Sequence, residues 1–182
     1  MQPDYKLDLV CPAGSLPALK AAVVDTLVPV NPEQGPAPRG PYSAGVRAGG
    51  LLFVSGQIAL LPDGSSLAHA DLETQTHQCL ANLRAVLEAG GATLQQVAKV
   101  TVYMAEPEGW PVFNPIYAEF FGAHRPARAI VPVAAFPGGF KVEMIATDHD
   151  RRFQASALHH LVELQARLRA IAVAEPADAR GQ

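Results

Sequence analysis

The spacing of apolar residues between positions 40 and 148 constrains the fold more than any other feature of the sequence. Two segments repeat apolar residues at intervals of three and four, which predicts helices over Leu72–Ala89 and Trp110–Phe121. Strand-like runs surround them at residues 42–48, 51–60, Val97–Met104, 129–135 and 140–147. The order β-β-α-β-α-β-β predicts an α+β domain, with its helices segregated against a mixed sheet.

Glycine-containing turns join several of these runs. Gly49-Gly50 predicts a hairpin between the first two strands, and Pro137-Gly138-Gly139 predicts a tight turn between the last two. Arg128 begins the first strand of that last pair and Glu143 lies within the second. Because the two strands are sequential, we expect that both side chains can occupy one face of the sheet.

The sequence divides into three parts. Residues 1–39 form an N-terminal extension with a predicted strand (6–11) and helix (16–25), and residues 28–39 are rich in proline, which is typical of a linker or arm. Residues 40–148 form the predicted domain. Residues 149–182 hold an amphipathic helix, whose single apolar face needs a cover from its own domain or from a neighbouring subunit. The apolar positions of that helix are Leu158, Leu161, Val162, Leu164, Leu168 and Ile171.

Composition excludes several classes of protein. The net charge of −3 gives no basic surface for nucleic acid. No apolar run approaches the roughly 18 residues that a membrane span needs. Cys11 and Cys79 lack the spacing of a disulfide framework or a metal site, so we expect both to be reduced in a cytoplasmic protein.

Arg128 and Glu143 are the candidates for chemistry. A guanidinium at a strand end can bind a carboxylate through two parallel hydrogen bonds, although most arginines are simply solvated. A carboxylate within an apolar strand either faces solvent or lines a cleft, where it can position or deprotonate a water molecule.

Four further residues have two interpretations each. Ser55-Gly56 interrupts an apolar strand, as a β-bulge or as a place where a ligand approaches the main chain. Tyr42 is a core ring or a pocket wall, and Asn114 is a solvated helix residue or a hydrogen-bond partner of the loop before Arg128. The sequence contains no Gly-x-Ser-x-Gly, P-loop or Gly-x-Gly-x-x-Gly motif, and its six histidines show no metal-ligand spacing. Nothing implies a metal or a cofactor.

An ordered set of motifs resembles the Rid family, also called YjgF/UK114. The motifs are Gly40-Pro41-Tyr42-Ser43, Leu52-Phe53-Val54-Ser55-Gly56-Gln57-Ile58, Gln75-Thr76-His77-Gln78-Cys79-Leu80-Ala81-Asn82-Leu83, Val97-Ala98-Lys99-Val100-Thr101-Val102-Tyr103, Asn114-Pro115-Ile116-Tyr117-Ala118-Glu119-Phe120-Phe121-Gly122, Arg125-Pro126-Ala127-Arg128 and Val142-Glu143. The match covers residues 40 to about 147. Residues 7–23 also resemble the first strand and helix of U32 peptidase-like proteins, whose remaining barrel and cluster-binding cysteines are missing here.

The Rid resemblance implies a chorismate-mutase-like α+β fold and a homotrimer with clefts between subunits. It also implies hydrolysis of reactive enamines and imines, such as 2-aminoacrylate, to 2-oxo acids and ammonia. Arg128 then corresponds to the carboxylate clamp and Glu143 to the residue that handles the attacking water. The substrate-binding positions are Tyr42, Ser55, Gly56, Asn114 and Ile130.

Three residues depart from the family pattern. Ala44 replaces the usual Gln, Ile130 belongs to an Ala-Ile pair in place of a polar one, and Ile145 replaces a second acidic residue. These changes predict a more apolar pocket. The alternatives are a non-catalytic or pathway-specific protein that binds a carboxylate ligand, and an endoribonuclease or translation inhibitor, against which the acidic balance argues.

Overall fold

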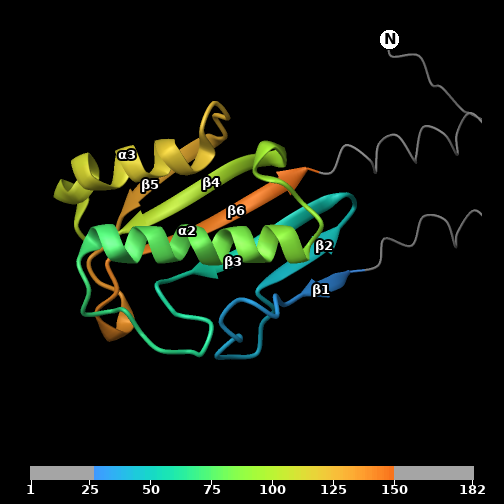
Figure 1. Cartoon of the computed structure of the whole chain (residues 1–182), viewed down its shortest axis with the longest axis horizontal. Coiled ribbons are helices and arrows are strands. Elements are labelled where there is room, and N and C mark those ends of the chain that lie inside the picture. The colour runs from blue at the N-terminus through green and yellow to red at the C-terminus, as the bar shows by residue number, and fades with distance from the viewer. Residues whose placement is uncertain (1–26, 150–182) are drawn as a thin grey trace, which may run out of the picture.

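Residues 27–149, the part of the chain that this computed structural model describes, form one six-stranded sheet with two helices on one of its faces (Figure 1). The elements are β1 (Val28–Val30), β2 (Gly45–Ala48), β3 (Leu51–Gln57), α2 (Leu72–Ala89), β4 (Val97–Met104), α3 (Trp110–Phe121), β5 (Ala127–Pro132) and β6 (Val142–His149). Three short 3-10 turns lie at Leu94–Gln96, Pro107–Gly109 and Pro137–Gly139. The predicted α+β class is confirmed, and both predicted helices have the observed bounds.

The strands lie in the order β1-β2-β3-β6-β4-β5. Every neighbouring pair is antiparallel except β4 and β5, which are parallel and joined through α3. The expectation that β5 and β6 sit side by side across a tight turn is therefore wrong. The turn at Pro137–Gly139 instead carries the chain past β4, so that β4 separates the two strands.

The hairpin predicted at Gly49-Gly50 is confirmed. Both glycines have positive φ, 56° and 74°, the conformation that a two-residue turn needs to match the twist of its strands. The two strands are shorter than expected, because residues 42–44 precede β2 and residues 58–60 follow β3. The pairing of β3 with β6 shifts register between Val54 and Gln57, which places an irregularity at Ser55-Gly56.

The core lies between the sheet and the helices. Val100, Val102 and Met104 alternate along β4 with exposed or half-buried residues, and all three are fully buried. Leu80, Leu83 and the other apolar residues of α2 cover them. The opposite face of the sheet has no helix over it among residues 27–149, and its Phe53 is 45% exposed. Within the described part of the chain, one face of the sheet is thus left without a helix, and we call it the open face.

Part of the predicted linker belongs to the sheet. Val28–Val30 pairs with β2, with Val30 opposite Gly45, so the interpretation of residues 28–39 as a linker or arm is wrong for these three residues. Next to them, the Asn31 side chain accepts a hydrogen bond from the Ala44 amide at 2.9 Å. The predicted strand 6–11, the helix 16–25, the segment 7–23 that resembles U32 peptidase-like proteins and the C-terminal helix all lie outside the described residues.

Gln75 joins α2 to the segment that leads into β6. It is fully buried, its amide nitrogen donates to the Ala68 and Ala70 carbonyls at 3.0 Å each, and its oxygen accepts from the Lys141 amide at 2.9 Å. Three main-chain groups thus depend on the Gln75 side chain. One of them, the Lys141 amide, lies two residues before Glu143.

We expect Gln75→Leu to lower the free energy of unfolding by about 3 kcal/mol, because it leaves these buried groups without partners. Urea titration measures the change. The exposed Glu73→Gln in the same helix serves as a control, with an expected change below about 0.5 kcal/mol. Equal stability of the two variants would contradict the assigned role of Gln75.

Among residues 27–149, no helix is both long enough and apolar enough to cross a membrane.

Candidate functional site

The Arg128 side chain is held against α3. Arg128 is the second residue of the edge strand β5 and lies opposite Val100 of β4, so its side chain points toward the face of the sheet that the helices cover. Its Nη2 donates to the Asn114 Oδ1 at 3.0 Å. Its guanidinium carbon lies 4.9 Å from the Trp110 ring centre and 4.5 Å from that of Tyr117. A half-buried arginine with these contacts is fixed in orientation. Its other N–H groups make no hydrogen bond to residues 27–149, so within this part of the chain they are available for a carboxylate.

Two residues of this arrangement were missed by sequence reasoning. Trp110 and Tyr117 lie on the same side of α3 as Asn114, at spacings of three and four residues, which is the signal that could have identified them. Burial raises the pKa of Tyr117 to about 12, although the positive charge of Arg128 acts in the opposite direction. Tyr117 therefore stays a neutral phenol, and its ring face attracts the guanidinium.

Glu143 lies on the open face of the sheet. It is half-buried on β6, opposite Tyr103 of β4, and its carboxylate reaches over Gly56 of β3. A Cβ atom at Gly56 would overlap the Glu143 Oε1, so only glycine allows this approach. Loss of hydration on burial raises the pKa of Glu143 above its ordinary value. A carboxylate with a raised pKa is a stronger base than an ordinary glutamate, which suits it to accept a proton from a water molecule.

Ser55 precedes Gly56 on β3 and is hydrogen bonded to the segment that follows Tyr42. The Ser55 hydroxyl donates to the Ser43 carbonyl at 2.7 Å, and its amide donates to the Ala44 carbonyl at 2.9 Å. Tyr42 is 54% exposed, and its hydroxyl accepts from the Arg39 amide at 3.3 Å. The bulge interpretation of Ser55-Gly56 agrees with the register shift, and the Tyr42 ring is not part of the core.

The structure separates the predicted site residues into two groups. Arg128, Asn114 and Ile130 lie together where α3 meets the edge strand β5, whereas Glu143 and Gly56 lie on the open face. The reason is register. Arg128 is opposite Val100, Glu143 is opposite Tyr103, and residues an odd number apart on β4 point to opposite faces. The expectation that Arg128 and Glu143 share a face is therefore wrong within one chain.

The raised pKa of Glu143 has a consequence for stability. A carboxyl group whose pKa is higher in the folded state favours folding when protonated, and this contribution is lost as the pH rises through that pKa. We expect Glu143→Gln to raise the melting temperature at pH 7 relative to the parent chain, and this difference to shrink toward pH 4. Thermal unfolding across this pH range measures it. A difference that grows toward pH 4 would contradict the desolvation of this carboxylate.

Within residues 27–149, no group of three or more His, Cys, Asp or Glu side chains could hold a metal ion. Cys79 is fully buried in the core, where loss of hydration raises the pKa of its thiol. Its sulfur hydrogen bonds only to the Val142 carbonyl among described partners, at 3.5 Å. This cysteine has the surroundings of a core residue rather than those of a nucleophile.

Sequence comparison finds relatives that span most of the described region. The profile of the Endoribonuclease L-PSP family matches residues 32–148. Protein HMF1 of Saccharomyces cerevisiae is 38% identical over 71% of this chain and 99% of its own length. A RutC family protein of Pyrococcus horikoshii is 41% identical over 63% of this chain and 90% of its own. Reactive Intermediate Deaminase A of Arabidopsis thaliana, a chloroplast protein, is 38% identical over 63% of this chain and 62% of its own.

Solved structures share the fold. The YjgF gene product of E. coli superposes with a TM-score of 0.64 at 34% identity, covering 68% of this chain and all but 1% of its own. The yeast protein YEO7 superposes with a TM-score of 0.66 at 37% identity, covering 69% of this chain and 100% of its own. In both cases the alignment leaves about a third of this chain without a counterpart.

Proposed function

Since the chain belongs to the Endoribonuclease L-PSP family, the YjgF/Rid family that its motifs resemble, we propose that it hydrolyses 2-imino acids, and the enamines that tautomerise to them, to 2-oxo acids and ammonia. The observation that carries the proposal is the guanidinium of Arg128, fixed by Asn114 and the rings of α3 and free to bind a carboxylate. One relative bears the name Reactive Intermediate Deaminase A, which agrees with this chemistry.

The reaction needs no covalent intermediate on the protein. Arg128 binds the substrate carboxylate and so orients the adjacent C=N bond. Glu143 accepts a proton from a water molecule as the water oxygen bonds to the imine carbon, and it returns this proton to the imine nitrogen as the C=N π bond opens. The resulting carbinolamine takes a second proton on nitrogen and loses one from its hydroxyl. The C–N bond then breaks, ammonia departs, and the C=O bond of the 2-oxo acid remains.

A complete site requires two copies of the chain. Arg128 and Glu143 project from opposite faces of one sheet, so one copy cannot aim both at one substrate. In the homotrimer that we propose, the edge strand β5 of one copy lies against the open face of the next. The group Arg128, Asn114 and Ile130 then faces Tyr42, Ser55, Gly56 and Glu143 across the cleft. The apolar Ile130 beside the clamp favours an imine with an apolar side chain.

Direct observation of imine loss tests the proposal. The substrate is generated in the cuvette; 2-aminoacrylate, for example, is released from a β-substituted amino acid by a separate lyase. The decay of imine absorbance is then followed with and without the protein. We expect the protein to accelerate the decay in proportion to its concentration. No acceleration, together with saturable binding of a 2-oxo acid, would instead assign a non-catalytic carboxylate-binding role and overturn the proposal.

A further inference from the structure

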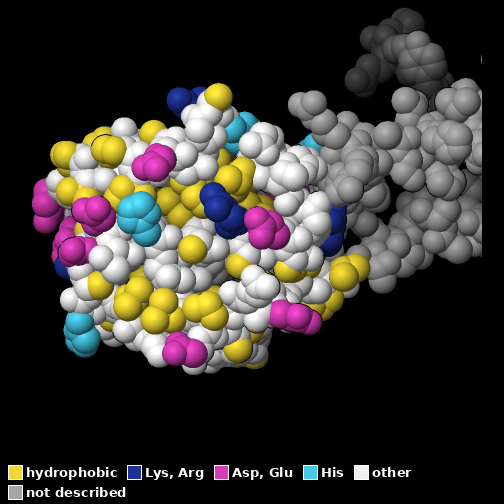
Figure 2. Space-filling model, in the orientation of Figure 1, with side chains coloured by type: hydrophobic (Ala, Val, Ile, Leu, Met, Phe, Trp, Pro, Cys, Tyr) yellow, Lys and Arg dark blue, Asp and Glu magenta, His cyan; other side chains and the backbone are white. Residues whose placement is uncertain are grey.

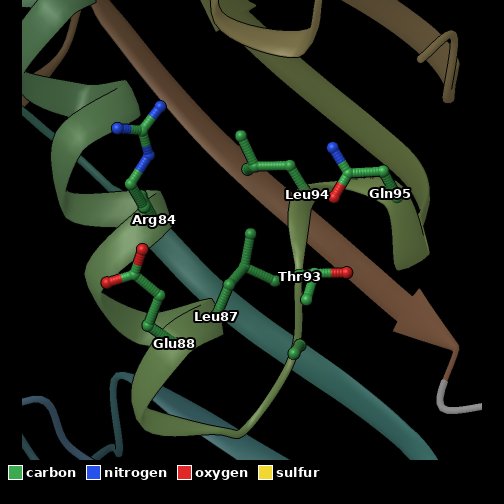
Figure 3. Close-up of a pocket in the computed structure, with 7 residues that line it drawn as sticks. Arg84, Leu87, Glu88, Thr93, Leu94 and Gln95 are labelled. Carbon is green, nitrogen blue, oxygen red and sulfur yellow. The ribbon is translucent and has the colours of Figure 1, made fainter.

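A groove runs along the outer surface of the helical layer. One part lies between α2 and α3, with a volume of about 310 Å³, and is lined by Leu80, Ala81, Ile116 and Phe120 among others. A second part of about 300 Å³ continues beside the C-terminal end of α2, where Leu87 faces Leu94 (Figure 3). Arg84 lines both parts, so the two adjoin at this side chain; we call them together the helical groove. Figure 2 shows hydrophobic side chains gathered between the two helices.

This groove is separate from the candidate catalytic residues, because neither part includes any of them. Its apolar lining is incompletely covered. Ile116, Phe120 and Leu94 pack against the core but remain only partly buried. Exposed acidic side chains stand along it, Glu88 from α2 and Glu119 from α3. Arg84, whose guanidinium lies over the Phe120 ring, lines both parts as well, so the charge along the groove is mixed. The apolar floor fits the apolar face of an amphipathic helix, and the two glutamates offer partners to basic residues beside that face.

The described chain ends beside this groove. His149 is the last residue of β6, and the preceding Asp148 pairs with Val97, directly after the 3-10 turn Leu94–Gln96 that lines the groove. In Figure 1 the tip of β6 and the C-terminal end of α2 lie at the same end of the molecule. Residues 150–157 can span about 26 Å when extended, which is close to the length of about 27 Å of α2, the helix along which the groove runs.

The sequence of that segment has the matching pattern. Leu161, Leu164, Leu168 and Ile171 repeat at helical spacing, and a helix over 158–171 would be about 21 Å long, against about 27 Å for α2. Arg167 and Arg169 flank Leu168, one on either side of the apolar stripe. HMF1 matches this chain over 99% of its own length yet only 71% of this one. The family profile ends at residue 148, so the segment lies beyond the shared domain.

We propose that residues 158–171 of this chain form a helix that docks in the helical groove of the same copy. Leu161, Leu164, Leu168 and Ile171 then cover Ile116, Phe120 and Leu94. The arginines beside the stripe approach Glu88 and Glu119. The C-terminal extension thereby becomes a third helix of the layer.

Thiol labelling of the full-length chain tests the docking. A reporter thiol is introduced by Ala81→Cys in a Cys11→Ala background, where the buried Cys79 stays unreactive. The rate of reaction with a maleimide is then compared with and without the pair Leu164→Asp and Leu168→Asp. We expect at least a tenfold faster reaction when the pair is present, because the docked helix no longer shields position 81.

The matched control carries the same two charges on the opposite side of the segment, as Ala166→Asp and Ala170→Asp, and should retain the slow reaction. A second reporter, Ala98→Cys on the exposed surface of β4, should react equally in all three backgrounds. Equally fast labelling of position 81 in all three backgrounds would overturn the proposal, since no segment then covers this position. Slow labelling that persists with Leu164→Asp and Leu168→Asp would also overturn it, since the occupant would then be another surface, such as a second copy.

Discussion

Replacement of Arg128 by alanine is expected to lower kcat/KM for a 2-imino acid by about 10³-fold. Two charge-assisted hydrogen bonds to the substrate carboxylate contribute about 2 kcal/mol each, and each 1.36 kcal/mol corresponds to a tenfold change in rate. Arg128→Lys keeps the positive charge but loses the paired geometry, so we expect a loss of about 10²-fold. Decay of imine absorbance at several substrate concentrations gives both values.

Arg125 supplies the matched control three residues earlier. It is exposed, and its guanidinium donates to the main-chain carbonyls of Gly122 and His124. Arg125→Ala should change kcat/KM by less than roughly twofold, since it contacts none of the proposed site residues. If Arg128→Ala remains folded and retains kcat/KM within threefold of the parent chain, the carboxylate clamp is assigned to the wrong residue.

Gly56→Ala is expected to lower kcat by about 10²-fold without any change in the catalytic groups themselves. The added methyl group would occupy the position of the Glu143 carboxylate, which must then rotate away from the water that it activates. Glu143→Gln removes the base directly and should cause a loss of similar size. Single-turnover decay of the imine measures the chemical step for both variants.

A double-mutant cycle separates this mechanism from general disruption of β3. If Gly56→Ala acts by displacing Glu143, it should lower kcat only slightly further in a chain that already carries Glu143→Gln. The two losses would then be far from additive. Fully additive losses would mean that Gly56 acts independently of Glu143, through the main chain of the bulge.

Most of the fold was predictable because its helices are long and periodic. Leu72–Ala89 has a regular apolar face and a glycine stop, so its two ends follow from the sequence. The three-residue strand β1 was not predictable, because an edge strand tolerates Pro29 and carries no alternating pattern of useful length. Its pairing with β2 depends on tertiary contacts that short sequence windows do not report.

The sequence could nominate the candidate residues one by one, but it could not predict how the structure arranges them. The motifs point to Arg128 and Glu143 individually, and the structure gives each a defined environment. Their faces depend on which strands pair and in what register. Sequential strands with a turn between them suggest a hairpin, whereas α3 takes β5 to the far side of β4. With this change of neighbour, the register on β4 puts the two side chains on opposite faces, which supports the proposal of a site shared between copies.

Mixed oligomers test the shared site most directly. The variants Arg128→Ala and Glu143→Gln, for which we expect losses of about 10³-fold and 10²-fold, are unfolded, combined in equal amounts and refolded together. If each site takes Arg128 from one copy and Glu143 from its neighbour, random assembly restores both groups in about one quarter of the sites. We therefore predict about 25% of the parent activity per chain in the mixture. A mixture that shows no more activity than its two components would contradict a site built between copies.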